Sequence, residues 1–267
     1  METTLTKKVD VDELEKKVKK MYQNVALNPK GEFHFEMGRG LAEKLGYEKQ
    51  DLDRIPAAAI ESFAGVGYYF DMANLKEGDH VLDLGSGSGM DVFTAALKVG
   101  STGKVSGVDM TDEQLEKAER LRNENNLTTG RQGFENVSFY KSYIENLPFD
   151  ASSFDVVISN GVINLSPDKE KVFTEVARVL KPKGRMVIAD IVTEKQLPEN
   201  VVCNSTLWAA CIGGASQQDD YKRAIENAGM EVIWIKNNEA YSFLSKSAKG
   251  ASKDYGVKSV SLVAGKK

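Results

Sequence analysis

The stretch Val81-Leu82-Asp83-Leu84-Gly85-Ser86-Gly87-Ser88-Gly89 joins an apolar strand that carries one acid to three glycines at alternate positions. Gly85, Gly87 and Gly89 allow a sharp turn and a close approach of a ligand, because no Cβ stands in the way and a positive φ costs little. The next residues, Met90 to about Val99, are predicted to form a helix whose free N–H groups face that turn. The stretch therefore predicts a ligand site of the α/β type.

Two acids indicate the kind of ligand. The Gly-x-Gly-x-Gly spacing differs from the dinucleotide fingerprint, whose turn receives a pyrophosphate, and Asp83 would repel such an anion. A carboxylate suits a cationic group instead, such as the amino group of S-adenosylmethionine. Asp109 follows Gly89 by twenty residues and ends a second predicted strand, where α/β nucleotide sites place an acceptor for ribose hydroxyls. We therefore predict a methyl-donor site, with a nicotinamide oxidoreductase as the weaker alternative.

Composition narrows the class of protein. The chain has 267 residues, 41% of them apolar, which suits one large domain or a domain with a substantial extension. Its net charge of −4 argues against a general polyanion binder, so no nucleic-acid partner is expected. No apolar run approaches the roughly 18 to 20 residues that span a bilayer, and the chain starts with charged residues. We expect a soluble, cytoplasmic protein that acts on a small molecule, as a monomer or a dimer.

The two cysteines, Cys203 and Cys211, exclude a disulfide framework and fit a reducing compartment. On one helix they would lie about 12 Å apart, too far to bridge. Only His34 and His80 supply imidazoles, which is too few ligands for a structural metal site. No metal is therefore expected.

Apolar periodicity predicts alternating strands and helices, which means a parallel sheet covered on both faces. Helices at 10–24, 36–45 and 52–64 precede it, followed by a flexible, aromatic segment at 65–70. An insert at 193–215, rich in apolar and small residues, interrupts the alternation at the rim where substrate contacts gather. The predicted strands are 80–84, 104–109, 136–140, 154–159, 184–190, 231–236 and 257–263, and the remaining helices are 90–99, 112–126, 168–180 and 217–228.

This order resembles the class I S-adenosylmethionine-dependent methyltransferase fold. The resemblance implies an α/β, Rossmann-like, seven-stranded and mostly parallel sheet with an antiparallel last strand. It also implies a helical cap over residues 1–70 and a methyltransferase domain over 71–267. More narrowly, the chain is similar to the arsenite methyltransferase family from about Leu45 to Gly229. The stretches that carry this similarity are Leu82 to Asp91, Gly107 to Thr111, Ile158 to Lys169 and Leu207 to Ala215.

The resemblance assigns roles around S-adenosylmethionine, whose product is S-adenosylhomocysteine. Asp83 would face the amino group, Asp109 the ribose, and Glu145 the exocyclic amine of adenine. The alternatives are structural: Asp83 accepts backbone N–H groups, Met110 and Ile144 belong to the core, Glu145 is solvated and Asn160 caps a turn. The predicted cofactor-binding residues are Asp83, Gly85, Ser86, Gly87, Gly89, Asp109, Met110, Ile144, Glu145, Asn160 and Val162.

Departures from the family concern the substrate. The arsenite methyltransferases hold trivalent arsenic with cysteines, and of those positions only Cys211 keeps one here. Gly161 stands at another, and Ala64-Gly65-Val66-Gly67 replaces the region of a third. One thiolate cannot replace a chelate of two or three. Cys211 is the predicted catalytic residue, and the predicted substrate-binding residues are Tyr68, Tyr69, Gly161 and Trp208, with a place in the core as the alternative for Trp208.

Three functions remain open. The first is a methyltransferase that acts on a small molecule other than trithiol-bound arsenite. The second methylates arsenite or another metalloid, using Cys211 with Cys203 or with external thiols. The third is a non-catalytic protein that binds S-adenosylmethionine.

Overall fold

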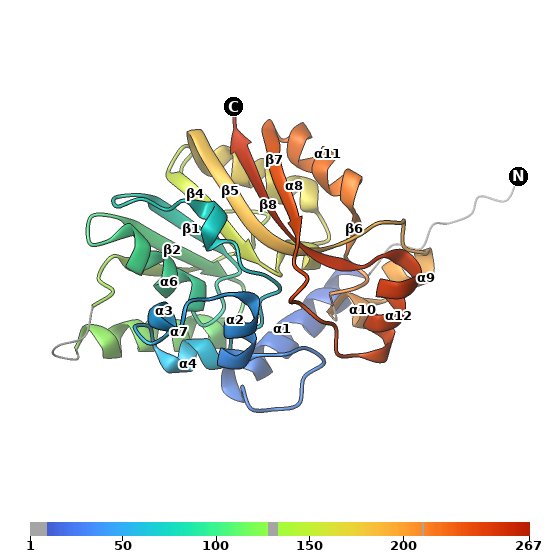
Figure 1. Cartoon of the computed structure of the whole chain (residues 1–267), viewed down its shortest axis with the longest axis horizontal. Helices are drawn as coiled ribbons and strands as arrows, with labels where there is room; N and C mark the ends of the chain where they lie inside the picture. The colour runs from blue at the N-terminus through green and yellow to red at the C-terminus, as the bar shows by residue number, and fades with distance from the viewer. Residues whose placement is uncertain (1–9, 128–132, 210) are drawn as a thin grey trace, which may run out of the picture.

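One twisted sheet runs through the chain, with helices on both of its faces (Figure 1). The computed structural model describes residues 10–127, 133–209 and 211–267, and there the strands form an eight-stranded sheet in the order β3-β2-β1-β4-β5-β8-β7. The short β6 pairs with β5 off this path, and β8 runs antiparallel to both of its neighbours. The strands are β1 His80–Leu84, β2 Lys104–Asp109, β3 Val137–Lys141, β4 Phe154–Asn160, β5 Leu180–Thr193, β6 Ser216–Gln217, β7 Met230–Asn237 and β8 Lys258–Lys266.

The register of the central strands brings their carboxyl ends to one edge. Leu84 lies opposite Val108 of β2 and opposite Ser159 of β4. Asp83, Asp109 and Asn160 therefore come within reach of one ligand, although they are far apart in the sequence. In open α/β sheets this edge is where ligands bind.

Side chains of β1 alternate between two hydrophobic clusters, as the period of a strand requires. Val81 packs with α6 and α7, whereas Leu82 and Leu84 pack with α8 and α11 on the opposite face. Helix α6 lies between Gly89 and Gly100 and is buried along most of its length. The larger helices are α1 Val11–Leu27, α2 Gly38–Leu45, α6 Met90–Val99, α7 Asp112–Asn126, α8 Lys169–Val179, α11 Gln218–Asn227 and α12 Lys246–Tyr255.

The class I methyltransferase architecture, with its antiparallel last strand, is thus confirmed. The proposed division into a cap at 1–70 and a domain at 71–267 stays a prediction. Leu14 and Leu41 of the cap share one hydrophobic cluster with Val81 and Val187 of the sheet.

The helix expected at 52–64 is shorter than predicted. Helix α4 spans only Ala57–Glu61, with Pro56 as its N-cap, and a separate short helix, α3 Lys49–Leu52, ends where the predicted helix begins. The ring of Pro56 disfavours a helical conformation at Ile55, so one continuous helix cannot pass through this point.

The segment at 65–70 is fixed in place, contrary to the flexible link that we expected. Val66, Tyr69 and Phe70 are buried, and helix α5 spans Phe70–Ala73. The hydroxyl of Ser259 donates to the Val66 carbonyl at 2.6 Å, which ties this segment to β8.

The insert at 193–215 contains two short helices, α9 Glu199–Val202 and α10 Ser205–Ala209. Helix α10 packs against α1, at the other end of the sequence. Helix α12 between β7 and β8 was not predicted, because its alternation of lysines, serines and small residues gives a weak apolar signal.

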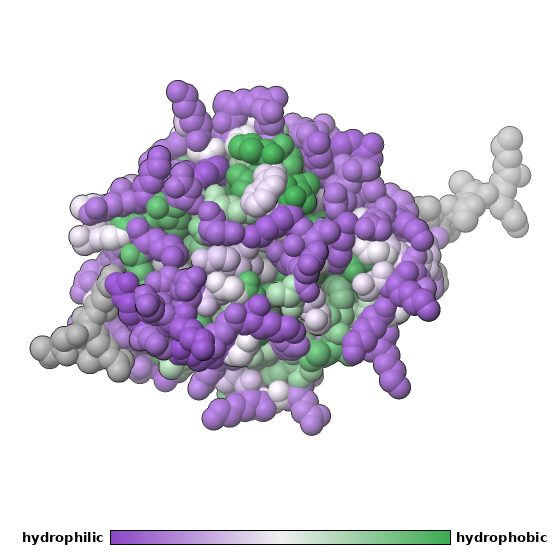
Figure 2. All heavy atoms as spheres, viewed as in Figure 1, coloured by the Kyte–Doolittle hydropathy of each residue, from purple (hydrophilic) through white to green (hydrophobic). Residues whose placement is uncertain are grey.

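The face shown in Figure 2 is mostly hydrophilic, with a hydrophobic area over the ends of β7 and β8. On β7, Ile233 and Trp234 are the exposed large apolar residues. Among the described helices, none is both long and apolar enough to cross a bilayer.

Candidate functional site

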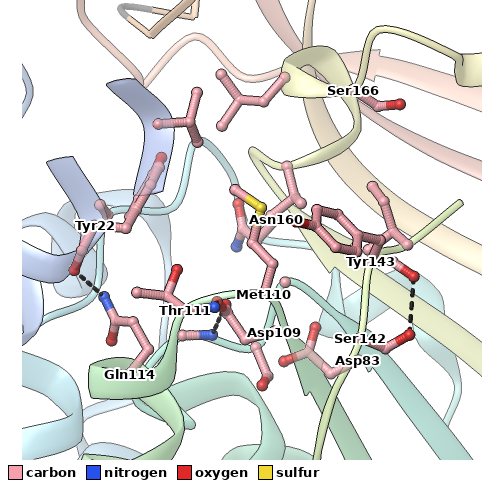
Figure 3. A pocket seen from close by; sticks show the side chains of 18 of the residues that line it. Tyr22, Asp83, Asp109, Met110, Thr111, Gln114, Ser142, Tyr143, Asn160 and Ser166 are labelled. Atoms are coloured by element: carbon pink, nitrogen blue, oxygen red, sulfur yellow. Dashed lines mark hydrogen bonds between the residues drawn. The ribbon is translucent and has the colours of Figure 1, made fainter. Parts of the chain in front are cut away.

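A cavity of about 570 Å³ lies between the carboxyl ends of β1, β2 and β4 and helix α1. Its volume falls within the range of about 300 to 1,000 Å³ that is usual for ligand pockets. Figure 3 shows Asp83 and Asp109 on the sheet side and Tyr22 on the helix opposite. Ten of the eleven residues predicted to bind the cofactor line this cavity: Asp83, Gly85, Ser86, Gly87, Asp109, Met110, Ile144, Glu145, Asn160 and Val162. Gly89 is the exception, although its neighbours Ser88 and Met90 line the cavity.

The glycine turn forms the floor of the cavity. Gly85 has φ +69°, and a Cβ there would lie 2.5 Å from both Cγ atoms of Val162. The backbone and Val162 therefore meet at a distance that only glycine permits. The hydroxyl of Ser86 is buried and has no hydrogen-bond partner among the described residues. Such a hydroxyl in a cavity wall is a group that a polar ligand would satisfy.

Asp83 is only 3% exposed, and within the described parts of the chain no hydrogen bond to its carboxylate is found. The structural alternative, an acid that binds backbone N–H groups of the turn, is therefore not what the geometry shows. Burial raises the pKa of Asp83 well above its usual value, and the nearby Asp91 and Asp109 raise it further. A cationic ligand would stabilise the ionised carboxylate, which burial disfavours.

Asp109 is held by the backbone. Its Oδ2 accepts the N–H of Gly87 at 2.9 Å, and its Oδ1 accepts that of Thr111 at 2.8 Å. Burial raises the pKa of Asp109, and these N–H groups oppose the rise. Each carboxylate oxygen retains a lone pair for a ligand hydroxyl.

Asn160 fastens β4 to the segment in front of β1. Its side-chain oxygen accepts the N–H of Val66 at 2.8 Å, and its amide nitrogen donates to the Gly67 carbonyl at 3.0 Å and to Asp91 at 3.2 Å. The side chain thus serves this segment, not the turn that follows it.

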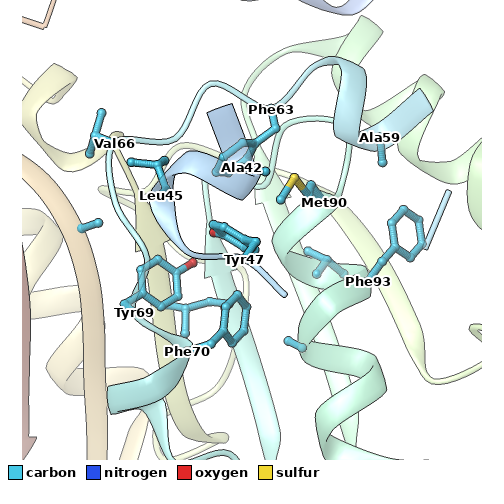
Figure 4. Close-up of a cluster of buried hydrophobic side chains, with 14 of the residues drawn as sticks. Ala42, Leu45, Tyr47, Ala59, Phe63, Val66, Tyr69, Phe70, Met90 and Phe93 are labelled. Atoms are coloured by element: carbon cyan, nitrogen blue, oxygen red, sulfur yellow. The ribbon is translucent and has the colours of Figure 1, made fainter. Parts of the chain in front are cut away.

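Asp91 also lines the cavity, although it was not among the residues predicted from the sequence. Its carboxylate accepts the hydroxyls of Tyr47 at 2.6 Å and Tyr69 at 2.7 Å, and Figure 4 shows these two rings with their hydroxyls directed toward one another. Burial raises the pKa of Asp91, and these hydrogen bonds lower it. An acid inside the apolar helix 90–99 was the available signal.

Helix α1 closes the cavity from above. Its Val11, Leu14 and Val18 line the cavity, together with Tyr22. The carbonyl of Tyr22 accepts the side-chain amide of Gln114 at 2.9 Å. At the other end, Lys19 donates to the hydroxyl of Tyr143 at 2.6 Å and lies over its ring.

The predicted substrate residues do not line this cavity. Tyr69 is fully buried, and its hydroxyl donates to Asp91. Tyr68 packs against Tyr47. Trp208 is 5% exposed and donates to the carbonyl of Val202, as a core residue would. Gly161 lies behind the wall, where a Cβ would be 3.1 Å from Val66.

Cys211 lies in a separate small hollow with Tyr22, Ala64, Val66 and Tyr241. Its φ is +61°, and burial followed by the charge of Asp190 raises its pKa to about 12. Cys203 follows α9 and precedes α10, so the two cysteines do not share a helix and no disulfide joins them. Among the described residues no cluster of three or more His, Cys, Asp or Glu side chains suits a metal ion.

Comparison with known proteins identifies the family. A family model described as a methyltransferase domain matches residues 75–229, more than half of the chain. The chain belongs to the methyltransferase domain family. Members of this family use S-adenosylmethionine, and the chain has their class I fold.

Several relatives of this chain are named arsenite methyltransferases. The protein of that name from Halobacterium salinarum is 38% identical over 76% of this chain and 50% of its own length. The mouse protein of the same name is 32% identical over 86% of this chain and 63% of its own length. The crystal structure of an arsenic(III) S-adenosylmethionine methyltransferase from Chlamydomonas reinhardtii matches with a TM-score of 0.63 and 31% identity, over 86% of this chain and 74% of that one. The chain thus spans about half to two thirds of the length of these two curated relatives.

The cavity of this chain fits the family's cofactor. Within the described parts of the chain, an acid without a hydrogen-bond partner, an unpaired buried hydroxyl and a floor that admits no Cβ lie together at the carboxyl edge of the sheet. These are groups that an amino-acid end and a ribose would satisfy. Asp83, Ser86 and Asp109 are the residues that would hold them.

Proposed function

We propose that this methyltransferase transfers the methyl group of S-adenosylmethionine to a small organic acceptor, not to trithiol-bound arsenite. The observation that carries the proposal is the lining of the cavity, in which neither Cys203 nor Cys211 takes part. Trivalent arsenic is a soft centre that needs two or three thiolates. At neutral pH the thiol of Cys211, with its pKa near 12, stays protonated.

The part of the cavity under α1 supports an apolar acceptor. It is lined by aliphatic and aromatic side chains, and the ring of Tyr22 projects into it from the helix (Figure 3). No hydrogen bond to the Tyr22 hydroxyl is found within the described residues, so this group is available to orient a polar atom of the acceptor. The aliphatic and aromatic lining consists of Val11, Leu14, Val18, Tyr22, Phe63 and Leu165.

The residues of this chain chiefly bind, orient and exclude water. The bound cofactor supplies a methyl group on a good leaving group, so the reaction needs alignment more than proton transfer. Asp83 and Asp109 would hold the cofactor, and α1 with the segment fastened by Asn160 covers the cavity. Burial raises the pKa of Tyr22 well above its usual value, so its hydroxyl stays protonated at neutral pH and no phenolate is available to act as a base. An acceptor that already has a lone pair is therefore favoured.

Arsenite is the second candidate. Relatives bear that name, and three positions that hold arsenic-binding cysteines in the family converge here, because Ala64, Val66 and Cys211 line one hollow and Gly161 adjoins Val66. In that case Cys211 would act with external thiols or with Cys203.

The test is production of S-adenosylhomocysteine by the purified protein with S-adenosylmethionine. One reaction contains arsenite and glutathione, and others contain amine, thiol and carbon nucleophiles of low polarity. Turnover with an organic acceptor that survives in the Cys203→Ser/Cys211→Ser variant supports the proposal. Turnover with arsenite that this variant loses supports the second candidate. Tight binding of S-adenosylmethionine without turnover of any acceptor favours a non-catalytic binding protein.

A further inference from the structure

The carboxylate of Glu145 lines the cavity and is held from behind by one hydroxyl. Its Oε1 accepts the hydroxyl of Ser166. The direction of this bond is fixed, because the N–H of Asp168 donates to the same Ser166 oxygen at 3.1 Å and leaves its proton for Glu145. Within the described residues no other hydrogen bond to Glu145 is found, so its second oxygen can accept one from a ligand.

Lys169 fixes the turn that carries this hydroxyl. Its ammonium donates to the backbone carbonyl of Ser166 at 2.8 Å and lies 4.9 Å from the ring centre of Trp208 in α10. Lys169 does not itself line the cavity. The Asn-Leu-Ser-Pro-Asp-Lys stretch, residues 164–169, therefore links the insert to the wall beside Glu145.

The charges around Lys169 support this arrangement. Burial lowers its pKa to about 8, while Asp190 and Glu145 oppose the shift, so the ammonium is charged at neutral pH. Asp190 is itself held by Tyr221 at 2.6 Å and Asn164 at 2.5 Å. A carboxylate only accepts hydrogen bonds.

We propose that Lys169 is a positioning residue that, through Ser166, orients Glu145 to select a purine with an amino group over one with a keto oxygen. This inference rests on the proposed binding of S-adenosylmethionine in the cavity. An amino group donates to the free carboxylate oxygen, whereas a keto oxygen would face it with like partial charge. A site built around one hydrogen bond rejects a ligand that leaves its polar group unpaired.

The experiment compares two ligands by isothermal titration calorimetry: S-adenosylhomocysteine and S-inosylhomocysteine, which differ at this purine position. The variants are Lys169→Met, which keeps an apolar side chain of similar length, Ser166→Ala and Glu145→Gln. Lys181→Met is the matched control, because Lys181 is also partly buried and bonded, at 2.7 Å to Asp155, but lies away from the cavity. Thermal unfolding of each variant identifies any that fails to fold.

The wild type is expected to bind S-adenosylhomocysteine more tightly. Lys169→Met and Ser166→Ala should each weaken that binding about fivefold, the size of one lost hydrogen bond, and leave the inosyl ligand unchanged. Adding Lys169→Met to Glu145→Gln should not weaken the binding of S-adenosylhomocysteine further, because both substitutions act on the same contact. Lys181→Met should keep the full preference.

A Lys169→Met variant that keeps the wild-type preference would overturn the positioning role, as would an equal loss for both ligands. A wild type that binds both ligands equally would overturn it too. Failure of the wild type to bind either ligand is a different result, which would overturn the proposed function.

Discussion

The side-chain oxygen of Asn160 accepts the N–H of Val66 at 2.8 Å and so joins the carboxyl end of β4 to a segment that precedes β1 in the sequence. The side-chain nitrogen of Asn160 donates to Asp91 on α6. One neutral side chain thus holds three walls of the cavity together.

Replacing the side chain of Asn160 should remove the hydrogen bonds that join these three walls of the cavity. Asn160→Ala leaves the Val66 N–H and the Gly67 carbonyl without their partner, which we expect to lower the free energy of unfolding by about 1–3 kcal/mol. Urea unfolding followed by circular dichroism measures this loss. Asn136→Ala is the control, because that amide makes one bond, to the Gly100 carbonyl at 2.9 Å. Equal losses in the two variants would contradict the bridging role.

The raised pKa of Asp83 predicts opposite effects of pH on folding and on binding. The folded chain keeps a proton that the unfolded chain has released above its pKa of about 3.9, so stability falls as pH rises from there toward the folded pKa. A ligand with an ammonium group prefers the ionised form. Its affinity therefore rises with pH through the same window.

Calorimetric titration of S-adenosylhomocysteine from acidic to neutral pH checks this prediction. Asp83→Asn should flatten the dependence and weaken binding at neutral pH by about tenfold or more, since a charge-assisted bond is lost. Asp155→Asn, on β4 and paired with Lys181, should bind like the wild type. A pH dependence that persists in Asp83→Asn would show that another group is responsible.

Burial should make Cys211 a slow thiol. With its pKa near 12, the thiolate fraction at pH 8 is about 10⁻⁴, and the side chain is 8% exposed. We expect the folded Cys203→Ser variant to react slowly with an aromatic disulfide reagent, and urea to release a full equivalent of thiol. Cys211→Ser, which keeps the more exposed Cys203, should react faster. Rapid labelling of folded Cys203→Ser would speak against a buried, protonated thiol.

Gly85 should tolerate no side chain. Gly85→Ala combines a backbone cost of about 1–2 kcal/mol at φ +69° with a Cβ that lies 2.5 Å from Val162. Gly229→Ala isolates the backbone cost, because Gly229 has φ +88° and nothing within 4 Å of an added Cβ. The midpoint of urea unfolding should fall further for Gly85→Ala, and Val162→Ala should recover part of the difference. Identical midpoints for the two alanine variants would exclude the contact with Val162.

Local sequence patterns predicted most of the sheet. The ranges 80–84, 90–99, 104–109 and 112–126 match β1, α6, β2 and α7 residue for residue. These segments carry their own signals: short strands that each include an acid, a glycine at each end of α6 and acids in the first turn of α7. Where apolar periodicity is weak or interrupted, as around Pro56 and in α12, the helices were not predicted correctly.

The residues of the candidate site were also predicted only in part. The glycine turn and the acids Asp83 and Asp109 were found from the sequence, because a ligand site at the carboxyl edge of a parallel sheet follows from strand order. Their roles toward the cofactor stay predictions, as do those of Tyr68, Tyr69, Gly161, Trp208 and Cys211. The structure places these last five outside the cavity wall.

The sequence by itself determined the strand, the glycine turn and the helix that make the floor of the cavity, because each depends on neighbours a few residues away. Only the tertiary structure decided its walls and cover. Asp91 meets Tyr47 and Tyr69, Tyr22 of α1 closes the top, and Lys169 reaches Trp208. These contacts join residues tens of positions apart, and a side chain's partner at such a separation is fixed by how the helices pack, which no local periodicity encodes.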